Sequence, residues 1–211
     1  ILVANLFDFD PATDALPHDR LSEVDRYALA RYGEVTTRVL RAYDRYEFQT
    51  VVHTLNHYLT VDLSAFYVDI SKDRLYTFGP ESDARRSAQT AMHTIVDGLT
   101  RLIAPILPIT ADALWGNLPG TETDSVHLAD FPKRVETLVD PDLIDRWTRL
   151  LALRDAVNGE LEKLRQDKVV GTSLEATVGL TADGELAQLL ETYRDALPML
   201  FITSAVTLAT S

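Results

Sequence analysis

The stretch SDARRSAQTAMHTIVDGLTRLIAPI (82–106) decides the fold. Apolar residues recur in it every three or four positions, at Ala88, Met92, Ile95, Leu99, Leu102 and Ile106. This spacing puts them on one stripe of an amphipathic α-helix about five turns long. Pro105 is expected to kink or end the helix, because proline lacks a backbone donor and clashes with the previous turn.

The same helical period occurs on both sides of this stretch. Apolar stripes indicate further helices over residues 21–43, 48–59, 63–70 and 110–118. Because the connecting loops are short, neighbouring helices are expected to be antiparallel. We therefore predict a mainly α fold, in which residues 1–18 lead into a helical bundle over residues 19–120.

The sequence pattern changes after residue 120. A loop-rich connector that contains Pro132 and Pro141 occupies residues 121–141. A long helix, an alternating half-buried strand, a second helix and a β-branched strand are then predicted over residues 142–167, 173–180, 183–194 and 201–208. This order predicts a small α+β unit over residues 142–211.

Composition restricts the function. The chain has 211 residues, 32 Asp and Glu against 20 Lys and Arg, a net charge of −12 and no cysteine. A hydrophobic fraction of 46% indicates a globular protein, and no apolar run is long enough to span a membrane. Without cysteine there is no disulfide framework and no thiolate metal site. Because the first residue is Ile1 rather than methionine, we expect the chain to be a piece of a longer protein.

Motifs for catalysis and metal binding are weak. His53 and His57 have metal-ligand spacing in HTLNH, but Thr54 stands where a zinc protease has its glutamate, and no third ligand is evident nearby. The glycines form no phosphate-binding pattern. We therefore predict no catalytic residue, no metal site and no cofactor in this chain.

The positive charges suggest a polyanionic partner. Sixteen of the twenty are arginine, which forms bidentate contacts with phosphate. Clusters near predicted helix ends comprise Lys72 and Arg74, Arg85 and Arg86, and Lys163, Arg165 and Lys168. The alternative is that these residues are solvated or pair with the abundant acids. Among the aromatic residues, Tyr76 and Phe78 are expected to be exposed, whereas Phe48, Phe66 and Tyr67 are expected in the core.

Several strings carry a family resemblance. LSAFYVDISKDRLYT (63–77), ARRSAQTA (84–91) and LIAPILPITADALWGNLPG (102–120) resemble the anticodon-binding domain of bacterial isoleucyl-tRNA synthetases. Residues 161–180 and 201–208 resemble the junction region that follows in these enzymes. The related valine and leucine enzymes share the bundle but usually have a different string at 63–77, so they are the alternative within the family.

The resemblance implies a binding function. In such enzymes the bundle grips the anticodon stem-loop, here that of tRNA(Ile), and we assign backbone positioning to Lys72, Arg74, Arg85, Arg86, Arg165 and Lys168. Nothing resembles the His-Ile-Gly-His or Lys-Met-Ser-Lys-Ser signatures. The resemblance therefore implies that ATP–Mg²⁺ chemistry and editing belong to the rest of a cytoplasmic polypeptide, and that this piece alone is inactive. The acidic charge leaves a second class open, a helical scaffold for protein interactions.

Overall fold

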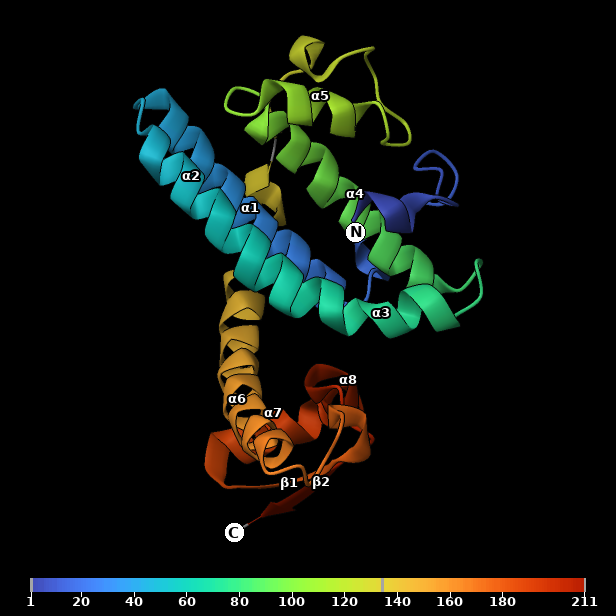
Figure 1. Ribbon diagram of the computed structural model, residues 1–211, viewed down its shortest axis with the longest axis vertical. Coiled ribbons are helices and arrows are strands. Elements are labelled where there is room, and N and C mark those ends of the chain that lie inside the picture. Colours follow the sequence, from blue (N-terminus) through green and yellow to red (C-terminus); the bar gives the residue numbers. More distant parts are fainter. Residues whose placement is uncertain (1, 134, 211) are drawn as a thin grey trace. The chain divides into compact units, whose positions relative to one another are not determined.

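The computed structural model describes residues 2–133 and 135–210 and divides the chain into two compact units, Ile1–Ile144 and Asp145–Ser211 (Figure 1). The first unit is helical, and the second combines helices with a two-stranded sheet. The predicted class, mainly α with a small α+β unit, is confirmed. No helix in the described ranges combines the length and apolar character needed to cross a bilayer.

The first unit contains a small set of packed helices. Their bounds are α1 (Glu23–Asp44), α2 (Phe48–His57), the π-helix η3 (Tyr58–Tyr67), α3 (Val68–Thr77), α4 (Asp83–Ile103) and α5 (Pro108–Trp115). Short 3₁₀ turns lie at η1 (Val3–Leu6), η2 (His18–Arg20), η4 (Val126–Leu128) and η5 (Val135–Leu138). The segments α2, η3 and α3 follow one another without a break, so the two stripes predicted at 48–59 and 63–70 belong to one continuous helical path (Figure 1).

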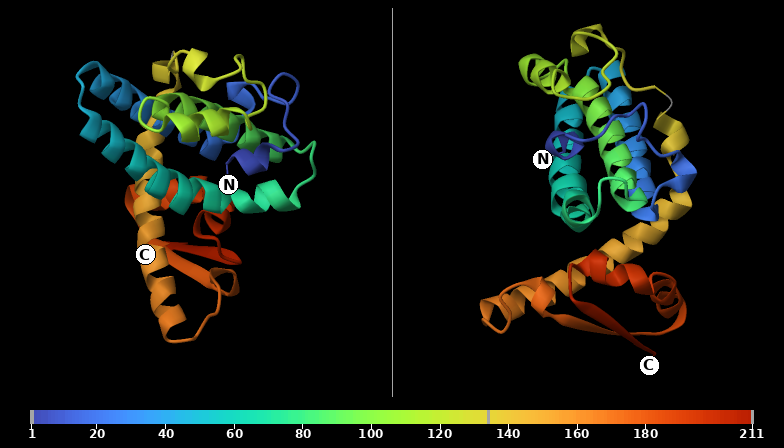
Figure 2. Two further views of the ribbon diagram at one scale, coloured as in Figure 1. Left: turned by 45° about the horizontal axis from the view of Figure 1, so that its top comes forward. Right: turned by 90° about the vertical axis from the view of Figure 1, so that its right-hand side faces the viewer.

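The centre of this unit is α4, which packs against α1, α3 and α5 (Figure 2). Its predicted stripe is buried, with Met92, Ile95 and Leu102 fully inaccessible. The helix ends at Ile103, just before Pro105, as predicted. At Gly98 a Cβ atom would lie 1.6 Å from Tyr32 Oη of α1, so only glycine permits this approach of the two helices.

The second unit is a β–α–β arrangement beside the long helix α6 (Pro141–Gln166). Strand β1 (Thr177–Ala182) pairs in parallel with β2 (Ala205–Thr210), and α7 (Gly184–Thr192), the 3₁₀ turn η7 (Arg194–Ala196) and α8 (Leu197–Phe201) connect them. Its core is formed by Trp147, Leu150, Leu190, Leu197 and Phe201.

Both strands begin later than predicted. Residues Ser173–Glu175 form a 3₁₀ turn, η6, before β1. Residues 201–204 precede β2 because α8, which has Pro198 in its first turn, extends to Phe201. Ile202 then caps that helix in the left-handed region at φ 54°. The β-branched composition identified the strand but not the helix end that precedes it.

Candidate nucleic-acid interface

Arg74, one of the six predicted contact residues, lies in the interior. Its guanidinium donates to both carboxylate oxygens of Asp25 at 2.8 and 2.9 Å, and Asp25 is fully buried. Tyr67 Oη and Ser87 Oγ donate to the same carboxylate at 2.6 and 2.5 Å. Burial raises the pKa of Asp25, but Arg74 and the hydroxyls of Ser22 and Ser87 outweigh it and hold that pKa below its usual value. This cluster ties α1, η3, α3 and α4 together.

Arg85 and Arg86 are also turned inward, with 8% of each residue exposed. Arg85 forms an ion pair with Asp8 at 2.7 Å. Arg86 donates to the Asp8 carbonyl at 2.8 Å and lies 3.4 Å from the Asp14 carboxylate. Both arginines therefore hold the lead-in segment against α4, although their place at a predicted helix end suggested that they reach a partner.

The other three predicted residues are exposed but differ in their partners. Lys72 pairs with Asp69 at 2.8 Å, a hydrogen bond that also raises the pKa of the lysine. Arg165 pairs with Glu162 at 3.3 Å. Lys168 has no ion pair among the described residues, and its backbone lies in the left-handed region at φ 57°. Of the four predicted residues in the first unit, only Lys72 is therefore exposed, whereas the second unit exposes both Arg165 and Lys168.

A different set of arginines lies together on α1. Arg38, Arg41 and Arg45 are the exposed arginines without an ion pair in the described part of the chain. Arg38 and Arg41 share one face of the last turns of α1, and Arg45 directly follows as the C-cap of the helix. Seven residues span about 10 Å of helix axis, which is the axial length of about three nucleotides in a duplex strand.

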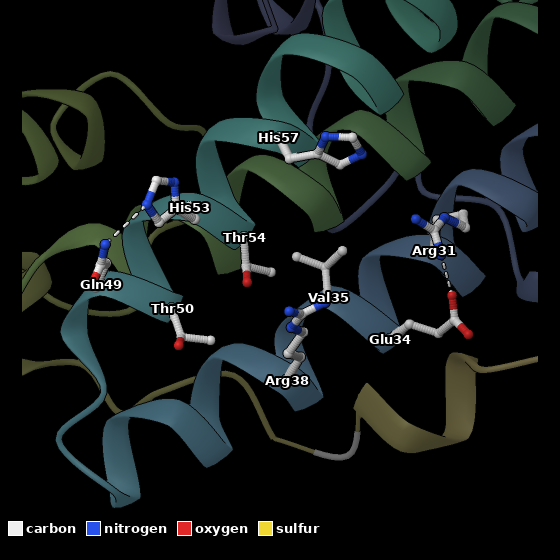
Figure 3. Close-up of a pocket in the computed structure, with 9 residues that line it drawn as sticks. All are labelled: Arg31, Glu34, Val35, Arg38, Gln49, Thr50, His53, Thr54 and His57. Carbon is white, nitrogen blue, oxygen red and sulfur yellow. Dashed lines mark hydrogen bonds and ion pairs between the residues drawn. The ribbon is translucent and has the colours of Figure 1, made fainter.

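These arginines line a groove between α1 and α2, which we call the arginine groove. Figure 3 shows the part of it that Arg38 lines. Its two overlapping parts have volumes of about 650 and 810 Å³. The floor and walls include the remaining residues Arg31, Glu34, Val35, Thr37, Gln49, Thr50, His53, Thr54 and His57, together with Ala42, Glu47, Glu136 and Val139. Arg31 pairs with both Glu34 and Asp62, so its own charge is compensated and it is not free to bind an anion.

The histidine pair belongs to this groove. His53 and His57 are both exposed on α2. Among the described residues, the hydrogen-bond partner of His53 is the Gln49 amide, at 3.5 Å. Figure 3 shows both imidazoles on the α2 side of the groove. Across residues 2–133 and 135–210, no three His, Cys, Asp or Glu side chains lie close enough together to hold a metal ion. The groove is therefore described by its cations and polar side chains.

Aromatic rings gather at the turn between α1 and α2. Tyr43 stacks on Phe131 with ring centroids 5.4 Å apart, and Phe48 lies edge-on to both Tyr43 and Tyr46 at 6.3 and 6.2 Å. Phe48 is 51% exposed, so its predicted place in the core was wrong. It is the first residue of α2 and lies at the turn between α1 and α2, where the side chain is exposed.

The other aromatic predictions are confirmed. Tyr76 and Phe78 are exposed, whereas Phe66 and Tyr67 are buried. The sequence predictions did not include the arginine groove, because Arg38, Arg41 and Arg45 are spread along the chain and form no compact cluster. Its signal was nevertheless present, as the i, i+3, i+7 spacing of Arg38, Arg41 and Arg45.

The geometry defines a helical domain with an accessible basic groove, and comparison with known proteins places it in a family. Residues 25–180 match the model of the anticodon-binding domain of tRNA ligases. The chain belongs to this family of anticodon-binding domains.

Individual relatives are more specific. The chain is 46% identical to the isoleucine–tRNA ligase of Syntrophotalea carbinolica over 98% of its own length. It is 44% identical to that of Halalkalibacterium halodurans over 100% of its length, and 42% identical to that of Geobacter sulfurreducens over 98%. It spans 22–23% of the length of these relatives. The predicted resemblance to the anticodon-binding region of bacterial isoleucyl-tRNA synthetases is confirmed.

Proposed function

We propose that this chain binds the anticodon stem-loop of tRNA(Ile) as part of an isoleucine–tRNA ligase, and that the arginine groove holds its phosphate backbone. The family match and the isoleucine-type relatives support the partner. The observation that carries the site is the row of unpaired, exposed guanidinium groups at Arg38, Arg41 and Arg45 on a chain of net charge −12.

The groove acts by positioning the RNA. Guanidinium groups contact phosphate oxygens with good geometry, and such contacts fix register without reading sequence. Three neutralised phosphates give a slope of about −2 to −3 in a plot of log affinity against log salt. Lys72, Arg165 and Lys168 remain proposed secondary contacts. For Arg74, Arg85 and Arg86 we propose a structural role, because a phosphate would have to displace their carboxylate or carbonyl partners.

The remaining chemistry is assigned to the rest of a cytoplasmic polypeptide. We propose that activation of isoleucine with ATP and Mg²⁺, and editing, occur there. An apolar groove of about 460 Å³ supports a contact with that remainder, since its lining includes Leu2, Leu59, Leu63, Leu99 and Ile103. The 211-residue chain alone should show no isoleucine-dependent exchange of pyrophosphate with ATP above a heat-inactivated control.

The proposal is tested by RNA binding at several salt concentrations. Labelled tRNA(Ile) and tRNA(Val) are titrated with the chain and with an Arg38→Ala/Arg41→Ala/Arg45→Ala variant. We expect binding that favours tRNA(Ile) at low salt, and a variant whose salt slope is smaller by about 2–3.

A matched control keeps the same change in net charge. Arg20, Arg149 and Arg194 are exposed but ion-paired, and their triple alanine variant should retain the slope of the original chain. No binding of either tRNA at low salt would reject the proposal and favour the protein-interaction scaffold. An equal loss of slope in both triple variants would reject the arginine groove as the site.

A further inference from the structure

The turn that joins α1 to α2 carries an aromatic surface beside the arginine groove, which we call the aromatic ladder: Phe131, Tyr43, Phe48 and Tyr46. Its inner part is fixed, because Tyr43 donates a hydrogen bond to the Leu102 carbonyl at 2.7 Å and stacks on Phe131. Its outer part is open, because Phe48 and Tyr46 are 51% and 79% exposed. Phe48 and Tyr46 therefore pack on neighbouring rings and keep a large part of their own surface exposed.

The backbone at Tyr46 is unusual. Tyr46 has φ 58°, directly after the end of α1, and the Glu47 amide donates to the Ala42 carbonyl at 2.9 Å. Helices that end this way usually have glycine at the left-handed position, because a Cβ atom is unfavourable there. Because the Tyr46 side chain is 79% exposed, burial does not account for a bulky residue at this strained backbone position, which points to a role outside folding.

The charges around the ladder select its ligand. Arg45 directly precedes Tyr46, Arg41 lies one turn earlier, and both line the arginine groove. Asp44 and Glu47 flank the same turn, and neither forms an ion pair with these arginines. Flat rings next to free guanidinium groups are the combination that binds single-stranded nucleic acid, whose bases stack while its phosphates are neutralised.

We propose that the aromatic ladder stacks unpaired bases of the RNA whose backbone occupies the arginine groove, with Tyr46 and Phe48 as the stacking residues. This inference rests on the proposed function and adds to it the residues that meet the loop bases. Paired stem nucleotides cannot stack on the ladder, because their faces are already covered. The ladder therefore contributes to binding of the loop and not of the stem.

The test uses the 211-residue chain and two RNA probes. One is a stem-loop with the isoleucine anticodon and 2-aminopurine at an unpaired loop position, and the other is a duplex of the same stem without a loop. A Tyr46→Ala/Phe48→Ala variant should lose about tenfold or more in affinity for the stem-loop and should lose the change in 2-aminopurine fluorescence. Its affinity for the duplex and its salt slope should stay unchanged.

The matched control is Tyr76→Ala/Phe78→Ala, which removes one exposed tyrosine and one exposed phenylalanine elsewhere in the same unit. This variant should bind both probes as the original chain does. A Tyr46→Gly variant separates structure from binding. Glycine relieves the left-handed backbone, so its melting temperature should be equal or higher while loop affinity still falls.

The outcomes distinguish this inference from the proposed function. Stem-loop binding with an unchanged fluorescence response in Tyr46→Ala/Phe48→Ala overturns the ladder and leaves the arginine groove intact. A lower melting temperature in Tyr46→Gly overturns it as well, because Tyr46 would then serve the fold. If neither probe binds the original chain at low salt, the proposed function and the ladder fail together, and a protein ligand for these rings is favoured.

Discussion

Two groups of arginines in the first unit have the same chemistry and opposite surroundings. Arg74, Arg85 and Arg86 lie inside the unit, each against this chain's own carboxylates. Arg38, Arg41 and Arg45 lie exposed along α1 without an ion pair to any described residue. The buried arginines stabilise the fold through their ion pairs, whereas the exposed arginines can bind a ligand.

The difference shows why basic residues that are close in sequence do not by themselves identify a binding surface in an acidic chain. With 32 carboxylates against 20 cations, a basic side chain near an element junction readily meets an acid. Arg85 and Arg86 meet Asp8 and Asp14 of the lead-in segment in this way. Of the carboxylates near the free arginines, Glu34 is engaged by Arg31, whereas Asp44 and Glu47 form no ion pair with them.

The largest effect that would sharpen this comparison is expected at Arg74. Replacing it with alanine leaves the Asp25 carboxylate buried without its counter-charge, which typically costs about 3–5 kcal/mol of folding free energy. Urea unfolding followed by circular dichroism measures the loss. An Asp25→Asn/Arg74→Met double variant should recover part of it, because neither charge is then buried alone. A loss below about 1 kcal/mol for Arg74→Ala would show that the cluster does not stabilise the fold.

A smaller loss is expected for Arg85→Ala/Arg86→Ala. Each substitution removes charge-assisted hydrogen bonds at the junction of α4 with the lead-in segment, at about 1–3 kcal/mol per charged partner. Stability should fall in urea unfolding, whereas the salt slope of tRNA binding should not change. A flattened slope with unchanged stability would return both residues to the phosphate contacts that the sequence suggested.

The helical fold could be predicted because it depends on local periodicity. The stripe through Met92, Ile95 and Leu102 identified α4, and Pro105 identified its end. The close packing of α1 on α4 could not be predicted, since it depends on a glycine at 98 meeting a tyrosine at 32. The start of β2 was displaced for a similar reason, because Phe201 and Ile202 first end and cap a helix.

The site was predicted only in part. The family strings identified the kind of ligand, but the partners of each charge come from distant positions. Arg74 pairs with Asp25, 49 residues away in sequence, and no local pattern reveals such a pair. The face formed by Arg38, Arg41 and Arg45 was visible in the sequence, but whether those residues are free depends on packing.

The buried cluster also predicts a pH dependence. The pKa of Asp25 is held below its ordinary value in the folded state, so the folded chain binds this proton less readily than the unfolded chain. The stabilisation is therefore complete above the unfolded value of about 3.9 and is lost as pH falls through the folded value. As pH falls below about 3.9, the original chain should therefore lose more stability than Asp25→Asn. Parallel losses in both proteins would assign the acid sensitivity to other carboxylates.

The smallest effect on stability is expected at the exposed arginines. Measuring it tests whether Arg38, Arg41 and Arg45 are free to bind RNA. Arg41→Ala removes a surface side chain without an ion pair, so the free energy of unfolding should change by less than about 0.5 kcal/mol. The same substitution should reduce the salt slope of tRNA binding by about 0.7–0.9, the contribution of one phosphate. Arg149→Ala, an exposed arginine paired with Asp145 at 3.2 Å, is the matched control and should leave the slope unchanged.

Because stability and slope are measured on the same variant, a contact made by Arg41 with the fold would appear in urea unfolding, and a contact with RNA would appear only in the salt titration. A clear loss of stability with an unchanged slope would place Arg41 with Arg74 among the structural arginines and remove it from the groove.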